Sequence, residues 1–428
     1  MREIVPPPPA IVRNDQAAVQ EQYQRNVVPS YGRFPLAFSH GAGSEIWDMG
    51  GRRYLDFATG IAVCCLGHAN AEITHALAEQ SQKLMHVSNL YYTQPGGQLA
   101  EELVKRIGPG KVFFCNSGAE ADEGLYKVAR KFGHDEGRFE ILTAFNSFHG
   151  RTLAGISATG QEKVKKGFEP LVQGFRHIPY NDLEAARAAI SPATVAILIE
   201  GIQGESGVTP ATVEYLTGLR KLCDEKKLLL LMDAVQCGHF RSGRYQSFQR
   251  ILEGHPEAAN FLPDGISMAK SLGGGFPIGA FWVRQPYADL LGAGTHGTTF
   301  GGNALGCAVA LKIISVIERD RLVDNIRNLG ERIKGALTTL MHSYPKVIKE
   351  VRGLGMMMGV EFHSNIPALA GSDKATSLQI IGRLHEAGLL TVPSGAQTIR
   401  LLPAYNLKQN EADEGLSIIQ NVVAKLAS

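Results

Sequence analysis

The sequence contains no long hydrophobic run and almost no net charge, and these two shortages exclude two classes of partner. Its longest apolar stretches, such as residues 228–232, are far shorter than the roughly 20 residues that a membrane-spanning helix needs. The 428 residues carry a net charge of only +2, which gives no electrostatic reason to expect a nucleic acid. We therefore expect neither a membrane nor a nucleic acid as a partner.

Cysteines and signal-like segments are also scarce, which bears on where the protein works. Six cysteines in so long a chain, with Cys64 and Cys65 adjacent, are typical of reduced side chains packed in a core and not of a disulfide framework. The start, MREIVPPPPAIVRND, lacks the basic and then apolar segments of a secretory signal. We interpret residues 1–25 as an extended tail and expect a cytoplasmic protein.

Two kinds of binding motif are absent or incomplete. Cys237, His239 and His149 have no paired CxxC or HExxH spacing around them, so we predict no metal site. Residues 292–297, GAGTHG, match the GxGxxG pattern of dinucleotide-binding loops. However, no clear buried strand precedes them, and no suitable acidic residue lies about 20 residues later. A dinucleotide-dependent dehydrogenase is therefore not favoured.

The hydrophobic pattern predicts an α/β part and an α+β part, in a chain longer than one core usually fills. Residues 44–57 contain two strand-like runs around a Gly-Gly pair, which predict a hairpin. From about Gly67 helical and short apolar segments alternate, as in a parallel sheet with helices on both faces. After about residue 320 the pattern predicts a helix, a strand in GLGMMMGVEF, a helix near 376–388, a strand in TIRLLPA and a last helix. The predicted division is a tail at 1–25, a small domain from 26–66 together with 321–428, and a large domain at 67–320.

One βαβ unit of the large domain is clear from its sequence. Residues 194–199 (TVAILI) predict a continuous apolar strand, apolar residues recur at helical spacing from 213 to 223, and residues 228–232 predict a second buried strand. Ligands of parallel sheets bind at the carboxyl ends of the strands, so we expect a binding site where these two strands end. The polar side chains there are Glu200, Gln203 and Glu205 after the first strand, and Asp233 and Gln236 after the second.

A turn between a strand and a helix offers a second binding feature. Residues 111–115 predict a strand, and residues 125–132 carry one apolar face of a helix. Between them Ser117, Gly118 and Ala119 can direct backbone N–H groups at an anion, which the helix dipole also favours. We predict a phosphate site at this turn. The alternative is ordinary capping of the helix by Asn116 or Ser117.

Asp233 and Lys270 carry the chemistry that we expect of this site. A carboxylate behind five apolar residues is costly to bury unless it meets a cation, and a protonated pyridine nitrogen would serve. Helix capping is the alternative role for Asp233. Lys270 follows GISMA and precedes the glycine-rich SLGGGFPIGA. Desolvation there would lower the pKa of the amine and make it nucleophilic, as a Schiff base requires.

Seven motifs, taken in their order along the chain, resemble the class III aminotransferases from about residue 31 to about residue 425. They are FFCNSGAEA, FHGRT, GIQGESGV, DAVQ, AKSLGGGFPIGA, GTHGTTFGGN and RGLGMMMGVEF. The resemblance implies the α/β fold of fold type I pyridoxal-phosphate-dependent transferases. In that fold a large domain has a mostly parallel sheet covered by helices, and a small α+β domain is built from both ends of the chain. The implied cofactor is pyridoxal 5'-phosphate.

The resemblance also implies which residues hold this cofactor. Lys270 would bind it covalently and then act as the catalytic acid and base, and Asp233 would keep its ring nitrogen protonated. Gln236 would contact the ring hydroxyl, and Phe148 would stack on the ring, with core packing as the alternative for Phe148. The turn of Ser117, Gly118 and Ala119 would hold the phosphate.

Further residues concern the partner subunit and the substrates. By resemblance the protein is a homodimer with shared active sites, in which Thr299 reaches the phosphate of the other subunit, unless it is only a loop hydroxyl. Arg151 would hold the distant carboxylate of either substrate, and Arg400 would hold the α-carboxylate of glutamate. The second amino donor is an ω-amine, whose reacting carbon carries no carboxylate, and Glu205 would mask Arg400 when this donor binds. A structural ion pair between Glu205 and Arg400 is the alternative. Tyr31 is the remaining residue that the resemblance assigns to substrate binding.

The implied reaction moves the terminal amino group of N2-acetyl-L-ornithine to 2-oxoglutarate, as a step of arginine biosynthesis. Ornithine, 4-aminobutyrate or another ω-amino acid is the alternative donor, and a glutamate-1-semialdehyde-type aminomutase or a non-catalytic cofactor-binding protein are further alternatives. Ile61 stands where the ornithine enzymes carry a tyrosine, which disfavours free ornithine. Ala234 departs from the family pattern, because a glutamate usually follows the cofactor aspartate.

Overall fold

Seven strands form the central sheet of the protein, in the order β4-β12-β11-β10-β7-β5-β6. The computed structural model describes residues 15–427. Only β12 runs against its neighbours, and all the other pairs are parallel. The strands are β4 (Gly110–Cys115), β12 (Gly279–Arg284), β11 (Gly265–Met268), β10 (Leu229–Asp233), β7 (Thr194–Glu200), β5 (Glu140–Ala144) and β6 (Phe175–Ile178). The predicted βαβ unit is confirmed as β7, α8 (Val213–Lys226) and β10.

Helices cover both faces of this sheet, because successive side chains of each buried strand point to opposite sides. In β10, Leu229 and Leu231 pack in the cluster that includes α5, whereas Leu230 and Met232 belong to the main core on the other face. The helices of this part are α3 (Ala71–Ser81), α4 (Gln94–Ile107), α5 (Gly118–Gly133), α6 (Leu153–Ala158), α7 (Leu183–Ala189), α8, α9 (Ser247–Ile251) and α10 (Ala304–Arg319). Among the described residues no helix is long and apolar enough to cross a membrane.

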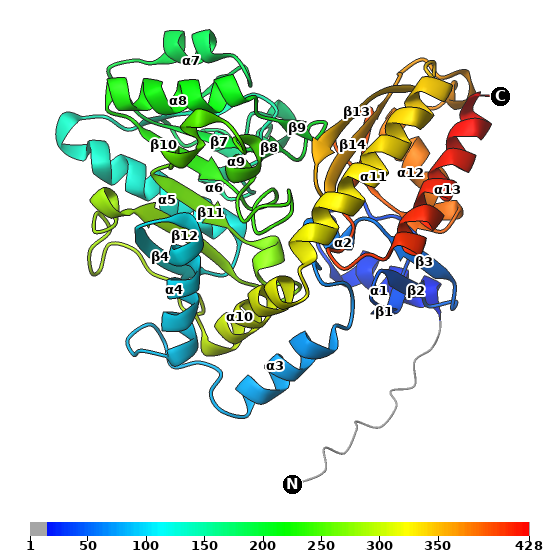
Figure 1. The fold of residues 1–428 in the computed structure, drawn as a ribbon, viewed down its shortest axis with the longest axis horizontal. Coiled ribbons are helices and arrows are strands. Elements are labelled where there is room, and N and C mark those ends of the chain that lie inside the picture. The colour runs from blue at the N-terminus through cyan, green and yellow to red at the C-terminus, as the bar shows by residue number, and fades with distance from the viewer. Residues whose placement is uncertain (1–14, 428) are drawn as a thin grey trace.

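The smaller part of the molecule lies beside the large sheet and joins both ends of the described chain (Figure 1). One of its sheets has the order β1-β2-β3-β15, so the predicted hairpin is present and its second strand pairs in parallel with a strand near the C-terminus. The other has the order β13-β14-β17-β16. The strands are β1 (Phe38–Ala42), β2 (Glu45–Asp48), β3 (Arg53–Asp56), β13 (Ile348–Leu354), β14 (Met357–Phe362), β15 (Leu389–Leu390), β16 (Val392–Pro393) and β17 (Thr398–Leu401). The helices of this part are α2 (Thr59–Ala62), α11 (Leu322–Ser343), α12 (Thr376–Glu386) and α13 (Gln409–Ala427), and a short hairpin of β8 (Ile202–Gln203) and β9 (Thr209–Pro210) follows β7. The exact domain limits stay a prediction.

The prediction of an extended tail up to residue 25 is wrong for its described portion. Helix α1 spans Gln16–Asn26, and the Asp15 side chain caps it by accepting hydrogen bonds from the backbone of Ala17 and Ala18. The prolines that suggested a tail end at Pro9, and the segment after them has a good N-cap and good helix formers. Residues 1–14 lie outside the described residues.

The segment GLGMMMGVEF was predicted as one strand, and it forms parts of two. β13 ends at Leu354 and β14 begins at Met357, and the two strands pair antiparallel. Gly355 makes the reversal possible, because its φ of 58° is one that a side chain disfavours. A Cβ atom there would also lie 2.7 Å from the carbonyl oxygen of Arg241.

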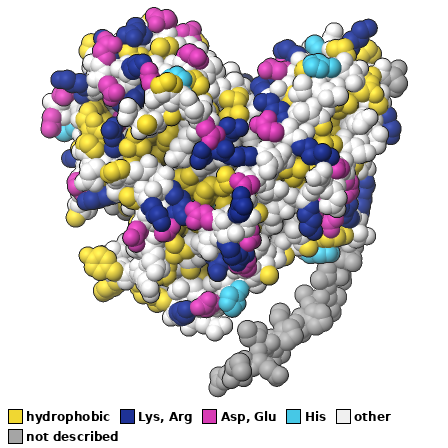
Figure 2. Space-filling view, in the orientation of Figure 1, with side chains coloured by type: hydrophobic (Ala, Val, Ile, Leu, Met, Phe, Trp, Pro, Cys, Tyr) yellow, Lys and Arg dark blue, Asp and Glu magenta, His cyan; other side chains and the backbone are white. Residues whose placement is uncertain are grey.

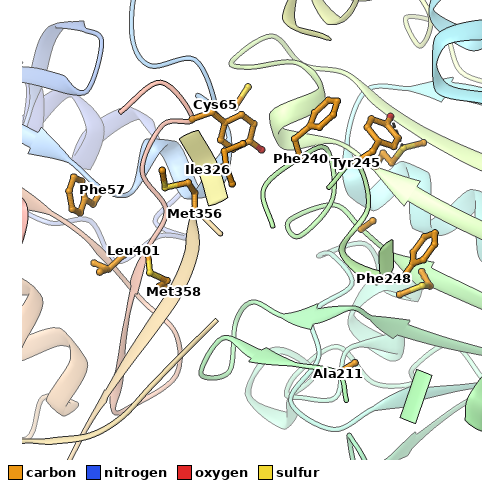
Figure 3. Close-up of a cluster of buried hydrophobic side chains, with 14 of the residues drawn as sticks. Phe57, Cys65, Ala211, Phe240, Tyr245, Phe248, Ile326, Met356, Met358 and Leu401 are labelled. Atoms are coloured by element: carbon orange, nitrogen blue, oxygen red, sulfur yellow. Dashed lines mark hydrogen bonds between the residues drawn. The ribbon is translucent and has the colours of Figure 1, made fainter. Parts of the chain in front are cut away.

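A continuous apolar cluster joins the two parts of the molecule. Figure 3 shows Phe240, Tyr245 and Phe248 on the side of the large sheet, opposite Met356 and Met358 of the small part, and all of them belong to one group of buried side chains. This packing fixes the position of β17 relative to the carboxyl ends of the central strands. On the face visible in Figure 2, Lys and Arg are interspersed with Asp and Glu, in keeping with the small net charge.

Candidate active site

A cavity of about 420 Å³ lies at the carboxyl edge of the central sheet. It forms where β4, β5, β7, β10 and β11 end, which is the place that the βαβ pattern predicted. Eight of the residues assigned to the site from the sequence line it: Ser117, Gly118, Ala119, Phe148, Arg151, Asp233, Gln236 and Lys270. These eight residues lie together in one cavity, although they come from four separate segments of the chain.

One wall of the cavity is the turn that enters α5. Ser117 is the N-cap residue, and its Oγ accepts a hydrogen bond of 3.2 Å from the backbone of Glu120. The capping alternative is thus present, and it leaves the first amide groups of the helix, those of Gly118 and Ala119, without intrahelical acceptors. A Cβ atom on Gly118 would lie 2.7 Å from the Val235 side chain, so a glycine is needed for this close packing. The turn can still bind an anion through its backbone.

Lys270 follows the last residue of β11 by two positions and has a backbone conformation that is unusual for a lysine. Its φ is 49°, and its carbonyl accepts hydrogen bonds from the backbone of Gly273 and Gly274. Burial, and then the charge of Arg400, lower the pKa of the Lys270 amine. A larger share of this amine is therefore neutral and nucleophilic at neutral pH than in an exposed lysine.

Asp233, at the end of β10, is held by a histidine whose role the sequence did not show. Its Oδ2 lies 2.8 Å from Nδ1 of His149, and its Oδ1 accepts a hydrogen bond of 3.0 Å from the backbone of Val235. Burial alone would raise the pKa of Asp233, but the His149 hydrogen bond and charge outweigh burial and lower it. Asp233 is thus an ionised carboxylate facing the cavity. His149 lies in the motif FHGRT, and no spacing around it in the sequence indicates a contact with Asp233.

Arg400 and Glu205 meet beside the cavity without lining it, and Arg400 contacts the cavity through Gln236, an arrangement that the sequence could not show. Arg400 is only 1% exposed, and its Nη1 donates to Oε1 of Glu205 at 2.9 Å and to Oε1 of Gln236 at 2.7 Å. Burial favours a raised pKa for Glu205, but the charges of Arg400 and Lys270 outweigh it, and the net shift of this pKa is downward. The glutamate is therefore ionised beside the arginine.

Tyr31 and Thr299 do not reach the cavity within one chain. Tyr31 is 75% exposed and lines a separate groove against α1. Thr299 is also exposed, next to Thr298, whose Oγ1 accepts a hydrogen bond of 3.0 Å from Asn116 near the anion-binding turn. Their roles in binding stay predictions.

Taken together, the cavity offers three different chemical contacts to one ligand. The turn at Gly118 can bind an anion, Asp233 can pair with a cationic ring nitrogen, and Lys270 can attack an electrophilic carbon. The GAGTHG segment lies in turns, with no strand directly before it and no helix until α10, so it has no dinucleotide-binding geometry. The arrangement suits a phosphorylated aromatic aldehyde with a basic ring nitrogen.

Comparisons with known proteins agree with this geometry. The sequence model of the family Aminotransferase class-III matches residues 27–423. The acetylornithine aminotransferase of Gloeobacter violaceus is 42% identical over 411 residues, which cover 95% of this chain and 98% of that protein. A solved structure of N-acetylornithine aminotransferase from Stenotrophomonas maltophilia is 31% identical with a TM-score of 0.78, over 95% of this chain and 98% of that one. The ornithine aminotransferase of Toxoplasma gondii, solved with partial occupancy of pyridoxal phosphate at its active site, is 28% identical with a TM-score of 0.89, over 97% and 96%.

Proposed function

This chain belongs to the class III aminotransferases, and from that premise we propose that it moves the terminal amino group of N2-acetyl-L-ornithine to 2-oxoglutarate. The products are the semialdehyde of N-acetylglutamate and L-glutamate, which places the reaction in arginine biosynthesis. The observation that carries the proposal is the buried contact between Arg400 and Glu205 beside Lys270, in a chain whose full-length relatives at about 40% identity act on acetylornithine by name.

The residues of the cavity fit pyridoxal 5'-phosphate. The free amide groups at Gly118 and Ala119 would hold its phosphate, and the ionised Asp233 would pair with its protonated ring nitrogen. Phe148 lies half-buried in the cavity wall, where it can cover one face of a ring. Gln236 uses Oε1 for Arg400, which leaves its Nε2 to donate to the ring hydroxyl oxygen. When bound, this cofactor supplies an electron sink for the carbanion that forms at the substrate.

Lys270 would attach the cofactor and then carry the proton of the reaction. Its neutral Nζ would take a proton from the reacting carbon of the donor and would return it to the carbon on the other side of the transferred nitrogen. Its lowered pKa suits this task, because an amine of ordinary pKa is almost fully protonated at neutral pH. Asp233 would stabilise the positive charge on the ring nitrogen, because His149 holds the carboxylate ionised and oriented.

The contact between Arg400 and Glu205 explains how one site can accept two donors. The reacting carbon of N2-acetyl-L-ornithine carries no carboxylate, so Glu205 pairs with Arg400 and no charge is left uncompensated. Glutamate brings an α-carboxylate, which would replace Glu205 as the partner of Arg400. Glu205 can move because its side chain is 28% exposed, unlike that of Arg400. Arg151, exposed at the cavity and packed against Phe148, would bind the distant carboxylate of either substrate.

We further propose that the active protein is a homodimer with shared sites. Thr299 would reach the phosphate in the partner's site, because it cannot reach the cavity of its own chain. Large apolar side chains are exposed around the same loop, among them Leu90 at 83%, Tyr92 and Phe300, and such a patch commonly marks a protein interface. A groove between residues 86–93 and 301–304 lies within this surface. Sedimentation should find twice the mass of the chain.

The substrate assignment is tested by mixing the purified holoenzyme separately with N2-acetylornithine, ornithine and 4-aminobutyrate, without an oxo acid. The change in cofactor absorbance in a stopped-flow instrument gives the rate of each first half-reaction. The proposal expects the fastest conversion with N2-acetylornithine. Faster conversion with ornithine would identify ornithine as the amino donor instead. Solved ornithine aminotransferases are also similar to this chain, so this alternative is included in the test. Continuous turnover of glutamate-1-semialdehyde without 2-oxoglutarate would indicate an aminomutase.

A further inference from the structure

A second buried acid lies behind the cofactor-facing carboxylate. Asp122, on the second turn of α5, is 2% exposed, and an oxygen of its carboxyl group lies within 4.8 Å of ligand-type atoms of both His149 and Asp233. Three such residues could suggest a cation site. However, His149 Nδ1 and Asp233 Oδ2 already face each other at hydrogen-bonding distance, and the Asp122 and Asp233 carboxyl groups are also in hydrogen-bonding contact. Hydrogen bonds of Asp233 with His149 and Asp122 therefore hold the cluster together, in place of a cation.

The surroundings of Asp122 compensate a negative charge poorly, because only the Ser267 side chain favours the ionised form among the groups that act on its pKa. Among the described residues no Lys, Arg or His forms an ion pair with it, and its Oδ1 accepts no hydrogen bond. An ionised carboxylate in such a place would lose its hydration without compensation. The ionisable or polar groups near it are Cys115 of β4, Tyr126 of α5, His149 after β5, Glu200 of β7, Asp233 of β10 and Ser267 of β11.

The electrostatic effects on the two acids run in opposite directions. Burial, and then the negative charge of Asp233, raise the pKa of Asp122 well above its ordinary range. The pKa of Asp233 is lowered, because His149 and the hydrogen bond with Asp122 together outweigh its burial. Two adjacent carboxyl groups that share one proton therefore hold it on Asp122.

We propose that Asp122 is a neutral carboxylic acid that donates a hydrogen bond to the ionised Asp233 and so acts as a positioning residue. With His149 on Oδ2 and the Val235 amide on Oδ1, this contact would hold the carboxylate from a third direction and leave it facing the cavity. The residue after Asp233 is Ala234, which brings no acid of its own. The role toward the ring nitrogen rests on the proposed cofactor, whereas the protonation state does not.

The protonation state is tested in the protein without cofactor or substrate, so the result does not depend on the proposed reaction. Infrared spectra of protein labelled with ¹³C on its aspartate side chains should show one isotope-shifted band of a protonated acid at neutral pH. Burial and the charge of Asp233 also raise the pKa of Glu200, which could therefore give a similar band. Labelling only aspartate separates the two bands. The band should vanish in Asp122→Asn and persist in Asp413→Asn, which removes an exposed aspartate paired with Arg332. A wild-type spectrum without any aspartic acid band would overturn the proposal even if Asp122→Asn fails to fold.

The positioning role is tested by titrating the same proteins with pyridoxal 5'-phosphate. Asparagine keeps a donor toward Asp233, so Asp122→Asn should bind within about threefold of wild type, whereas Asp122→Ala should bind about tenfold more weakly. The wild-type affinity should also fall at alkaline pH, where Asp122 ionises, and Asp122→Asn should lack this decline. Equal affinities of the asparagine and alanine variants, with both folded by thermal melting, would contradict a positioning role.

Discussion

The two ends of the candidate site, one at Asp233 in the cavity and one at Arg400 beside it, are built on different principles. At the Asp233 end the carboxylate is held within a buried cluster of three residues, His149, Asp122 and Asp233. At the Arg400 end a fully buried arginine meets a glutamate that is partly exposed. The first arrangement suits a ligand that stays bound, because fixed charges need no reorganisation. The second suits ligands that are exchanged in each cycle, because one partner of the arginine can be replaced.

The difference shows why the same cavity can hold a cofactor and still discriminate between substrates. Buried charges impose a desolvation cost, and at the Asp233 end this cost is met permanently by hydrogen bonds within the protein. At the Arg400 end the cost is met by Glu205 or by a substrate carboxylate in turn. Lys270 lies between the two ends, and Arg400 and Glu205 act on its pKa with opposite signs. Mutations can therefore separate the two functions.

Removing the side chain of Lys270, whose pKa groups at both ends influence, should have the largest effect on turnover. Lys270→Ala should retain the fold, because the side chain only partly fills a cavity wall, but turnover should fall by at least about 10⁴-fold as the proton carrier is lost. The visible absorbance of the covalently attached cofactor should disappear as well. Steady-state assays, absorbance spectra and thermal melting measure the three quantities. Turnover near the wild-type value would remove the central assignment.

A change at the Asp233 end, which we call the fixed end, should slow the reaction equally for every substrate. Asp233→Asn replaces the proposed ionised partner of the ring nitrogen by a neutral amide, and we expect kcat to fall about a hundredfold with both N2-acetylornithine and glutamate. Asp413→Asn, at an exposed ion pair, is the control and should change neither rate. The comparison of the two ends would be wrong if only one of the two substrates were affected.

The fixed end was only partly predictable from the sequence. Asp233 was identified because a carboxylate after an apolar strand needs a partner, and the anion-binding turn and Lys270 were identified from local motifs. His149 and Asp122 were not, because their contact with Asp233 joins three segments that are far apart in the chain. Spacing in a sequence gives no information on such contacts.

The Arg400 end, which we call the switchable end because Glu205 and a substrate can alternate as partners of the arginine, was predictable only through family resemblance. Nothing local to Arg400 or Glu205 indicates that β17 lies beside the loop after β7, and their contact depends on how the small part packs on the large one. The fold showed the same limit. The apolar βαβ pattern was sufficient for the central sheet, whereas helix α1 was missed because its amphipathic pattern is weak and none of its residues is buried.

At the switchable end the expected effect is smaller and specific to one substrate. Glu205→Gln weakens the charge that masks Arg400, so glutamate should bind better and its KM should fall about threefold to tenfold. The half-reaction with N2-acetylornithine should slow by a similar factor, because Arg400 would then lack its counter-charge. Glu414→Gln, at the part-exposed ion pair with Arg53, is the matched control. Parallel changes for both substrates would mean that Glu205 is only structural.

The smallest effect should appear in the pH dependence of stability at the same end. The pKa of Glu205 is lowered in the folded protein, so the charge of Glu205 stabilises the fold above its unfolded pKa of about 4.3, and this contribution is lost as the pH falls through the folded value. The difference in the free energy of unfolding between wild type and Glu205→Gln should therefore be constant near neutral pH. It should shrink by roughly 1 kcal/mol in acid, the order expected for a partly exposed pair. Urea unfolding at about pH 7 and about pH 3.5 measures the difference. A difference that grew in acid would show that Glu205 is not held ionised by Arg400.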